Sequence, residues 1–180
     1  MKRIDTSIPG VVIVEPEVFG DDRGYFMETF RQTWIDDLAP GSQLVQDNQS
    51  RSSRGTLRGL HYQAQTPQGK LVRVVSGEVF DVAVDIRRSS ATFGKWTAVH
   101  LSADNKRQFW VPEGFAHGFL VLSDSAEFVY KCTRYYDPED QQGIAWDDPD
   151  IGIAWPDAGE LLLSEKDRIA PRLKDAVLFP

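Results

Sequence analysis

Apolar and polar residues alternate with a period of two along most of this chain. That period places successive side chains on opposite faces of an extended strand, so it predicts half-buried β-strands. Residues that favour turns separate the alternating segments. The predicted strands are Val11–Val14, Gln43–Asn48, Thr56–Gln63, Lys70–Ser76, Glu78–Ile86, Lys95–Ser102, Arg107–Val111, Gly118–Leu122 and Glu127–Thr133.

Helical patterns are confined to two short segments. Gln32–Leu38 carries large apolar residues and is ended by Pro40. Ser164 is a suitable N-cap for a second helix of one or two turns over Ser164–Ile169. Many short strands with so little helix favour an antiparallel sandwich or barrel. We therefore expect one all-β domain over residues 1–180, with one or two short peripheral helices.

Two connections between predicted strands are very short. Gly77 separates Lys70–Ser76 from Glu78–Ile86 with almost no loop. The Ser123–Ser125 segment consists of residues that favour turns, so we predict a tight hairpin there.

Composition and charge narrow the range of partners. The formal net charge is −7, and an acidic chain holds polyanionic nucleic acid poorly, although arginines in one cleft can still bind a small anion. No stretch approaches the roughly 20 apolar residues of a membrane span, and MKRIDTSIPG lacks the apolar centre of a signal peptide. We expect a cytoplasmic protein that binds neither nucleic acid nor membrane. Cys132, the only cysteine, is expected to be a buried thiol.

The chain has three histidines, and two of them lie in suggestive surroundings. His117, in VPEGFAHGFL, completes a Pro-x-Gly-x-x-His spacing that resembles the second motif of the cupin family of jelly-roll barrels. The first cupin motif usually supplies two more histidines and a glutamate, which bind a metal. Here the corresponding string has only His61, and Lys70 follows shortly after it. Two histidines beside an ammonium hold a divalent metal poorly, so we predict no metal. His100 is expected to be an ordinary surface or barrel-wall residue.

Without a metal, His61 is free to act as a base near neutral pH. Strict alternation would put Arg58 and His61 on opposite faces of their strand. If both line one pocket, Gly59 should mark an irregularity, because glycine inside a strand often accompanies a bulge. The ordinary alternative is a barrel histidine that bonds to a neighbour.

Two further residues strengthen the case for catalysis. Lys70 begins a strand that should neighbour His61, where an ammonium would stabilise an oxyanion on a substrate carbonyl. Tyr130 alternates with Phe128 and Cys132 and should point into the barrel with them, where a phenol could donate a proton. Taken singly, strand-end lysines are usually solvated and inward tyrosines usually pack.

A second group of residues suits an anion and a flat ring. Arg23 and Arg58 offer guanidinium groups that match phosphate oxygens. Gln46 and Asn48 add amide groups, and the Tyr135-Tyr136 pair offers a stacking surface. Each of these is unremarkable alone.

The order of several strings resembles the dTDP-4-dehydrorhamnose 3,5-epimerase family. These strings are FGDDRGYFMETF, VQDNQSRSSRGTLRGLHYQ, QGKLVRVVSGEVFDVAVDIRRSS, FWVPEGFAHGFLVLSDSAEFVYKCT, YYDPED, WDDPDIGIAWP and LSEKD. The similarity runs from the first ten residues to about Asp167. RGLHYQ followed by QGKLVRV is not a general cupin pattern.

The resemblance implies a jelly-roll homodimer that acts without cofactor on dTDP-4-dehydro-6-deoxyglucose and inverts C3 and C5. It implies that His61 is the general base, supported by Asp167, that Lys70 polarises the ketone and that Tyr130 is the acid. The substrate-binding residues that it implies are Arg23, Phe26, Glu28, Gln46, Asn48, Arg58, His117, Tyr135 and Lys166. One departure is visible, since Gln141 stands where members often carry a glutamate.

Three alternatives stay open on the residues alone. The nearest is an epimerase at a single carbon, or a ketoisomerase, acting on a related nucleotide-linked 4-keto-6-deoxyhexose. The others are a metal-dependent cupin enzyme and a jelly roll that binds a sugar without turnover.

Overall fold

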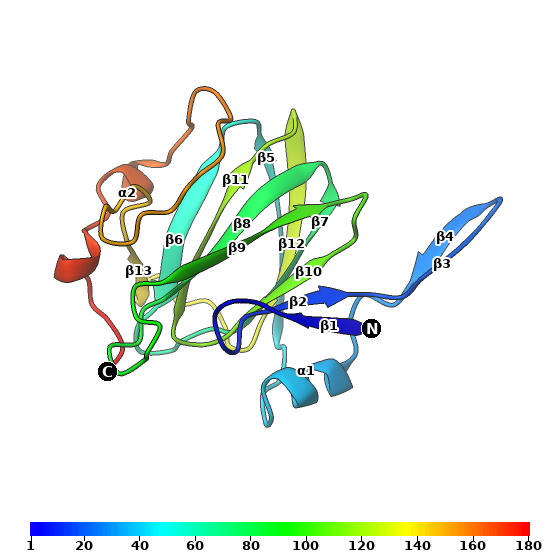
Figure 1. Ribbon diagram of the computed structural model, residues 1–180, viewed down its shortest axis with the longest axis horizontal. Coiled ribbons are helices and arrows are strands. Elements are labelled where there is room, and N and C mark those ends of the chain that lie inside the picture. The colour runs from blue at the N-terminus through cyan, green and yellow to red at the C-terminus, as the bar shows by residue number, and fades with distance from the viewer.

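The computed structural model describes residues 1–180 and consists mainly of two antiparallel sheets that face each other (Figure 1). One sheet has the strand order β1-β2-β10-β7-β12-β5 and the other has the order β13-β6-β11-β8-β9. The strands of the first sheet are β1 Lys2–Asp5, β2 Val12–Glu15, β10 Gln108–Val111, β7 Lys70–Ser76, β12 Ser125–Cys132 and β5 Gln46–Ser53. Those of the second are β13 Gln141–Gly143, β6 Leu57–Gln63, β11 Phe115–Val121, β8 Glu78–Asp85 and β9 Trp96–Ser102. The predicted all-β, antiparallel jelly-roll is confirmed.

Two short helices lie outside the sheets, as predicted. Helix α1 spans Gln32–Leu38 and buries Trp34 and Ile35. Helix α2 spans Glu165–Arg168, and the side chain of Ser164 caps it by accepting the backbone N–H of Asp167. A 3-10 turn, η1, follows at Leu173–Asp175. None of these helices has the length and apolar character needed to span a membrane.

The predicted hairpin at Ser123–Ser125 is wrong. This segment joins β11 to β12, but β11 pairs with β6 and β8, whereas β12 pairs with β5 and β7. The turn therefore carries the chain from one sheet to the other. Turn-forming residues show that the chain reverses, but they do not show whether the next strand lies beside or across from the last one.

The connection at Gly77 also crosses between the sheets, from β7 to β8. Its φ of +78° is in the left-handed region, and a Cβ there would lie 2.1 Å from the carbonyl oxygen of Ser125. Only glycine fits this crossing without a backbone shift.

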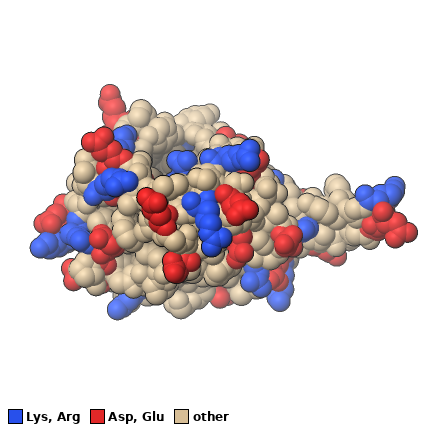
Figure 2. All heavy atoms as spheres, turned by 90° about the horizontal axis from the view of Figure 1, so that it is seen from above, with Lys and Arg blue, Asp and Glu red and all other residues tan.

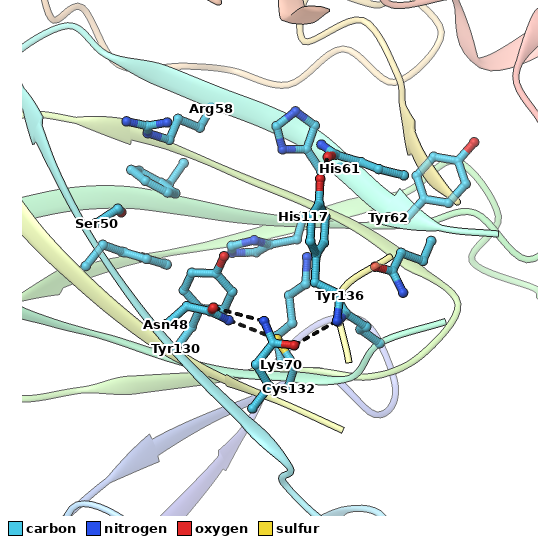
Figure 3. Close-up of a pocket in the computed structure, with 16 residues that line it drawn as sticks. Asn48, Ser50, Arg58, His61, Tyr62, Lys70, His117, Tyr130, Cys132 and Tyr136 are labelled. Carbon is cyan, nitrogen blue, oxygen red and sulfur yellow. Dashed lines mark hydrogen bonds between the residues drawn. The ribbon is translucent and has the colours of Figure 1, made fainter. Parts of the chain in front are cut away.

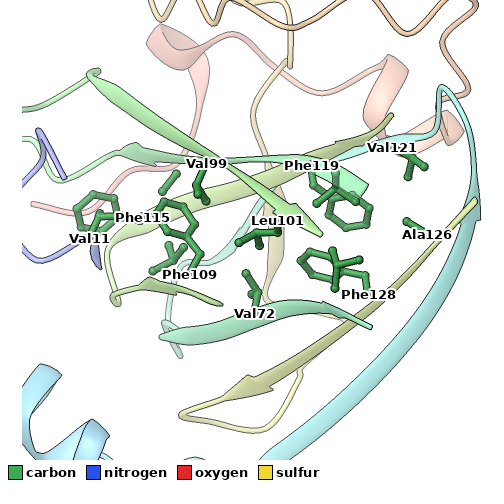
Figure 4. Close-up of a cluster of buried hydrophobic side chains, with 14 of the residues drawn as sticks. Val11, Val72, Val99, Leu101, Phe109, Phe115, Phe119, Val121, Ala126 and Phe128 are labelled. Carbon is green, nitrogen blue, oxygen red and sulfur yellow. The ribbon is translucent and has the colours of Figure 1, made fainter. Parts of the chain in front are cut away.

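The largest core cluster fills the space between the two sheets (Figure 4). Val72 and Phe109 enter it from the first sheet, and Val99, Leu101 and Phe115 from the second. At its edge the rings of Phe119 and Phe128 stack across the sheets, with centroids 4.2 Å apart. Figure 4 shows these two rings packed against each other between facing strands.

A hairpin that the period-two analysis did not predict projects from the body (Figure 1). It is formed by β3, Val18–Asp21, and β4, Gly24–Met27, which pair only with each other. Phe19, Tyr25 and Phe26 are all exposed on it. Figure 2 shows acidic and basic side chains together at the tip of this arm, where Arg23 forms an ion pair with Asp21.

Candidate active site

A pocket of about 320 Å³ opens between the two sheets, next to Phe119 and Phe128 (Figure 3). Strands β5, β7 and β12 supply one wall, and β6 and β11 supply the other. The lining residues are Gln46, Asn48, Ser50, Arg58, His61, Tyr62, Gln63, Gln68, Lys70, His117, Phe119, Phe128, Tyr130, Cys132, Tyr136 and Gln141. The core thus ends at a polar cavity.

Strand β6 carries a bulge that brings Arg58 and His61 to the same side. His61 lies opposite His117 on β11, but Arg58 lies opposite Phe119, so three steps on β6 match two on β11. The extra residue reverses the alternation of side chains, which is what a β-bulge does. Gly59 lies at this place with φ +120°, and a Cβ there would lie 2.6 Å from the Cα of Gly118. The irregularity predicted at Gly59 is confirmed.

His61 forms a hydrogen-bonded pair with Asp167. The distance from Nε2 of His61 to Oδ1 of Asp167 is 2.5 Å, and the two side chains are 31% and 4% exposed. Burial alone would raise the pKa of Asp167, but the hydrogen bonds and charge of His61, with help from Ser164 and the Gly59 backbone, hold it below the ordinary value. The ionised carboxylate accepts the Nε2 proton, which leaves the Nδ1 lone pair of His61 available as a base.

Lys70 and Tyr130 reach the pocket from the sheet that faces His61. The prediction that the Lys70 strand neighbours the His61 strand is wrong, because β7 pairs with β10 and β12 while β6 belongs to the other sheet. The short loop after β6 instead crosses between the sheets. Both residues still line the same cavity. Desolvation lowers the pKa of Lys70 and raises that of Tyr130.

A second histidine–aspartate pair lies deeper in the same wall. Nε2 of His117 is 2.9 Å from Oδ1 of Asp81 on the neighbouring strand β8, and both side chains are buried. Oδ2 of Asp81 has no hydrogen-bond partner. Burial raises the pKa of Asp81, although His117 and Lys70 oppose the shift. Asp81 is not among the predicted site residues, although an acid within the apolar alternation of GEVFDVAVD was a visible signal.

Amide and aromatic side chains line the mouth of the pocket. Gln46 donates to Asn48 over 2.9 Å and accepts the backbone N–H of Tyr136 over 2.7 Å, as Figure 3 shows. The hydroxyl of Tyr136 donates to Oε1 of Gln141, the residue that stands where a glutamate was expected. Arg58 donates to the hydroxyl of Ser52 over 3.1 Å and is otherwise exposed.

Five predicted binding residues do not line this pocket. Arg23, Phe26 and Glu28 belong to the projecting hairpin or follow directly after it; Phe26 is 71% exposed, and Glu28 pairs with Arg31. Tyr135 is 72% exposed, and its neighbour Tyr136 lines the cavity in its place. Lys166 is exposed on α2, beside Asp167. The remaining predicted residues are brought together here.

The pocket offers an imidazole base from one sheet, with a phenol and an ammonium from the other. It has the parts needed to remove a proton beside a carbonyl, stabilise the resulting oxyanion and return a proton from another direction. The chain contains no group of three or more His, Cys, Asp or Glu side chains placed to hold a metal ion.

Comparison with known proteins identifies the family. A chain from Neisseria gonorrhoeae described as dTDP-4-dehydrorhamnose 3,5-epimerase is 56% identical over 184 residues, and this chain spans 56% of that relative's length. A Pseudomonas aeruginosa protein with the same description is 56% identical over the whole of both chains. The crystal structure of a dTDP-6-deoxy-D-glucose-3,5-epimerase from Legionella pneumophila, in complex with dTDP-4-keto-L-rhamnose, superposes with a TM-score of 0.94 at 53% identity. That match covers 97% of this chain and 93% of the other. The family model for dTDP-4-dehydrorhamnose 3,5-epimerase matches residues 5–175, and the chain belongs to that family.

Proposed function

We propose that this protein is a dTDP-4-dehydrorhamnose 3,5-epimerase. It converts dTDP-4-dehydro-6-deoxy-D-glucose to dTDP-4-dehydro-L-rhamnose by inverting C3 and C5, and it uses no cofactor. The observation that carries the proposal is the placement of His61 and Tyr130 on opposite walls of one pocket that also holds Lys70.

His61 removes one proton from C3 and one from C5, in separate steps. Both protons are acidified by the C4 ketone that lies between these carbons, because the negative charge of the enolate rests on the C4 oxygen. The imidazole becomes positively charged when it takes the proton, and the ionised Asp167 at 2.5 Å stabilises that charge. The same hydrogen bond fixes the tautomer in which Nδ1 is free to act.

Lys70 stabilises the enolate oxygen, and Tyr130 returns a proton to the opposite face of the carbon. An oxyanion donor of this kind contributes about 3 kcal/mol to the transition state. The raised pKa of Tyr130 keeps the phenol protonated at neutral pH, as an acid requires. Because the proton leaves toward one sheet and arrives from the other, the configuration inverts.

The nucleotide end is bound by the mouth of the pocket. Arg58 suits a phosphate oxygen, and Gln46 and Asn48 suit the polar edges of the ligand. Gln141 brings an amide where an acid was expected, which removes one negative charge from the neighbourhood of the pyrophosphate.

We further propose that the single domain over residues 1–180 works as a homodimer. The β3–β4 hairpin leaves Phe19, Tyr25 and Phe26 exposed on an arm whose strands pair only with each other. The ammonium of Lys106 lies 4.3 Å from the centre of the Tyr25 ring, but Phe19 and Phe26 remain as apolar surface that favours a partner. An arm received by a second copy would carry Arg23, Phe26 and Glu28 to the partner's pocket. The cytoplasmic location stays a prediction.

The direct test is turnover of dTDP-4-dehydro-6-deoxyglucose in D₂O, coupled to a ketosugar reductase that traps the product. We expect NMR to find deuterium at both C3 and C5, with the L-rhamno configuration. Label at C3 or C5 alone would support a single-carbon epimerase. Activity lost to a chelator and restored by a metal would support a metal-dependent enzyme, and binding without label would support a sugar-binding protein.

A further inference from the structure

The Asp167 carboxylate has a second side-chain partner besides His61. The hydroxyl of Ser164 donates to Oδ2 of Asp167 over 2.8 Å, while Oδ1 faces His61. Ser164 Oγ also accepts the backbone N–H of Asp167 over 3.2 Å. The hydroxyl therefore uses its single proton on the carboxylate and a lone pair on the helix end.

Capping the helix accounts for only one of these two bonds. An N-cap needs a side-chain oxygen that accepts a backbone N–H from the first turn, and it needs no donor. When an acid occupies the third helical position, it commonly reaches back to the N–H of the cap residue itself. Here the acid at that position is Asp167, and its carboxylate faces His61 and the Ser164 hydroxyl.

The hydrogen bond from Ser164 to Oδ2 fixes the orientation of the Asp167 carboxylate. The terminal torsion of an aspartate is broad, so a carboxylate held at one oxygen can still rotate about the Cβ–Cγ bond. Asp167 is attached to a helix of only four residues, Glu165–Arg168, which offers little rigidity of its own. A donor at Oδ2 stops that rotation and keeps Oδ1 aimed at Nε2 of His61.

We propose that Ser164 is a positioning residue for the epimerisation, holding the Asp167 carboxylate in the orientation that pairs it with His61. This inference rests on the proposed function, in which His61 is the base. Ser164 does not line the pocket, so it acts through Asp167 and contributes to the rate of proton transfer and not to substrate affinity.

Three variants of Ser164 separate its role as a hydrogen-bond donor to Asp167 from its role as the N-cap of α2. Glycine at an N-cap costs only a few tenths of a kcal/mol, so Ser164→Gly removes the donor and nearly spares the helix. Ser164→Asp keeps a strong capping oxygen but has no proton to give at neutral pH. Ser164→Thr keeps both the acceptor and the donor. Ser123→Ala is the matched control, because Ser123 lies in a turn outside the pocket and makes the same two kinds of bond. Its hydroxyl accepts the backbone N–H of Glu78 over 2.8 Å and donates to the carbonyl oxygen of Ser125 over 2.8 Å.

Two readouts are compared across the variants. The first is the downfield proton resonance of the His61 imidazole, assigned by its absence in His61→Asn, which reports the hydrogen bond to Asp167 without any need for turnover. The second is kcat and KM for the 4-keto sugar nucleotide. We expect Ser164→Gly and Ser164→Asp to lose or broaden the resonance and to lower kcat about tenfold, with KM within about twofold. Ser164→Thr and Ser123→Ala should resemble the wild type in both.

The two proposals fail in different ways. A sharp, unshifted resonance in both Ser164→Gly and Ser164→Asp would overturn the positioning role, whatever kcat does. Folding of each variant is checked by circular dichroism, and the Thr variant decides whether the donor is what matters. If the wild-type protein shows no epimerisation, the proposed function fails, while the resonance still tests whether Ser164 holds Asp167 on His61.

Discussion

The two histidine–aspartate pairs of this protein have the same atoms in contact and different surroundings. Both join Nε2 to Oδ1, and His61 and His117 lie directly opposite each other on β6 and β11. The His61 side chain is 31% exposed, and its acid comes from a helix more than 100 positions away in the chain. The His117 side chain is 9% exposed, and its acid comes from the adjacent strand.

The different surroundings shift the pKa values of the two acids in opposite directions. Asp167 has donors for both of its oxygens, which offset its burial and hold its pKa low. Asp81 has one unsatisfied oxygen and no contact with water, so burial prevails and its pKa is raised. A histidine becomes a useful base only if it can reach both its substrate and a reliably ionised partner. We therefore assign proton abstraction to the His61 pair. We expect the His117 pair to stabilise the pocket wall, where His117 stays a predicted substrate contact.

The largest expected effect is the loss of turnover when the histidine of the His61–Asp167 pair is replaced. We expect His61→Asn to lower kcat about 1000-fold, because it removes the general base, and to leave the affinity for dTDP within about twofold. Steady-state kinetics and calorimetric titration with dTDP measure the two quantities. His100→Asn is the control, since His100 pairs with Glu78 on the surface outside the pocket. A variant at position 61 that keeps more than a tenth of the wild-type rate would contradict the assignment.

The second prediction separates the pairs by stability. His117→Asn takes the hydrogen-bond partner of the buried Asp81 carboxylate away, which should cost about 3 kcal/mol in free energy of unfolding at neutral pH. His61→Asn should cost less, about 1 kcal/mol, because Asp167 keeps the Ser164 hydroxyl and the Gly59 backbone as hydrogen-bond donors. Urea denaturation of the two variants gives both values. Equal losses of stability in the two variants would show that the two pairs do not differ in their contribution to folding.

The stability loss of His117→Asn should shrink as the pH falls. The pKa of Asp81 is raised in the folded state, so folding favours the protonated acid, and stability is gained as the pH falls through that pKa. Since His117 opposes the shift, its removal raises the pKa of Asp81 further and the variant gains more than the wild type. Unfolding curves at about pH 7.5 and about pH 5 test this, and a gap that widens in acid would contradict it.

The third prediction concerns the bulge of β6, which lies next to the position where His61 and His117 face each other. Gly59→Ala should cost about 2 kcal/mol in free energy of unfolding, because its φ is +120° and the new Cβ would lie 2.7 Å from the carbonyl oxygen of His117. Activity should fall as well, since the bulge keeps Arg58 and His61 on one side. Gly143→Ala, in the adjoining strand β13, is the matched control, because its Cβ meets nothing nearer than 3.5 Å. Equal thermal denaturation of the two variants would show that the bulge does not need glycine.

The smallest effect is expected in the alkaline limb of the pH profile. Desolvation lowers the pKa of Lys70, so its ammonium is lost at a lower pH than that of a free lysine and activity should fall there. Arginine stays protonated over this range. We expect Lys70→Arg to move the alkaline limb of kcat to higher pH, with the maximum lowered by no more than about tenfold. An unmoved limb would mean that Lys70 does not set it.

The sequence predicted most of the strands because their apolar faces are buried against one core. It predicted α1 with its observed bounds and the N-cap of α2. The β3–β4 hairpin was not predicted, because every residue of β3 and most of β4 are exposed and show no burial pattern. Strand β5 extends to Ser53 through the polar string QSRSS at a sheet edge, which an apolar count cannot detect.

The site was predicted in its residues more than in its geometry. The motifs named His61, Lys70 and Tyr130, but the assumption that consecutive strands lie side by side put Lys70 beside the His61 strand and not across from it. The partnership of His61 with Asp167 depends on a contact between distant parts of the chain, so only the family resemblance suggested it. Asp81 had a local signal, because it is a carboxylate within a buried alternating strand. The role of Ser164 follows only from its hydrogen bond to Asp167 in the folded chain.

The central claim is that one residue removes the proton and another, from the facing sheet, returns it. It is tested most directly by following deuterium uptake from D₂O into the sugar with the His61→Asn and Tyr130→Phe variants, under conditions in which the wild type labels C3 and C5. We predict that His61→Asn incorporates no deuterium, whereas Tyr130→Phe still incorporates deuterium but keeps the D-gluco configuration, because the base returns a deuteron to the face it came from. Deuterium uptake by His61→Asn, or inversion by Tyr130→Phe at the wild-type rate, would contradict the account.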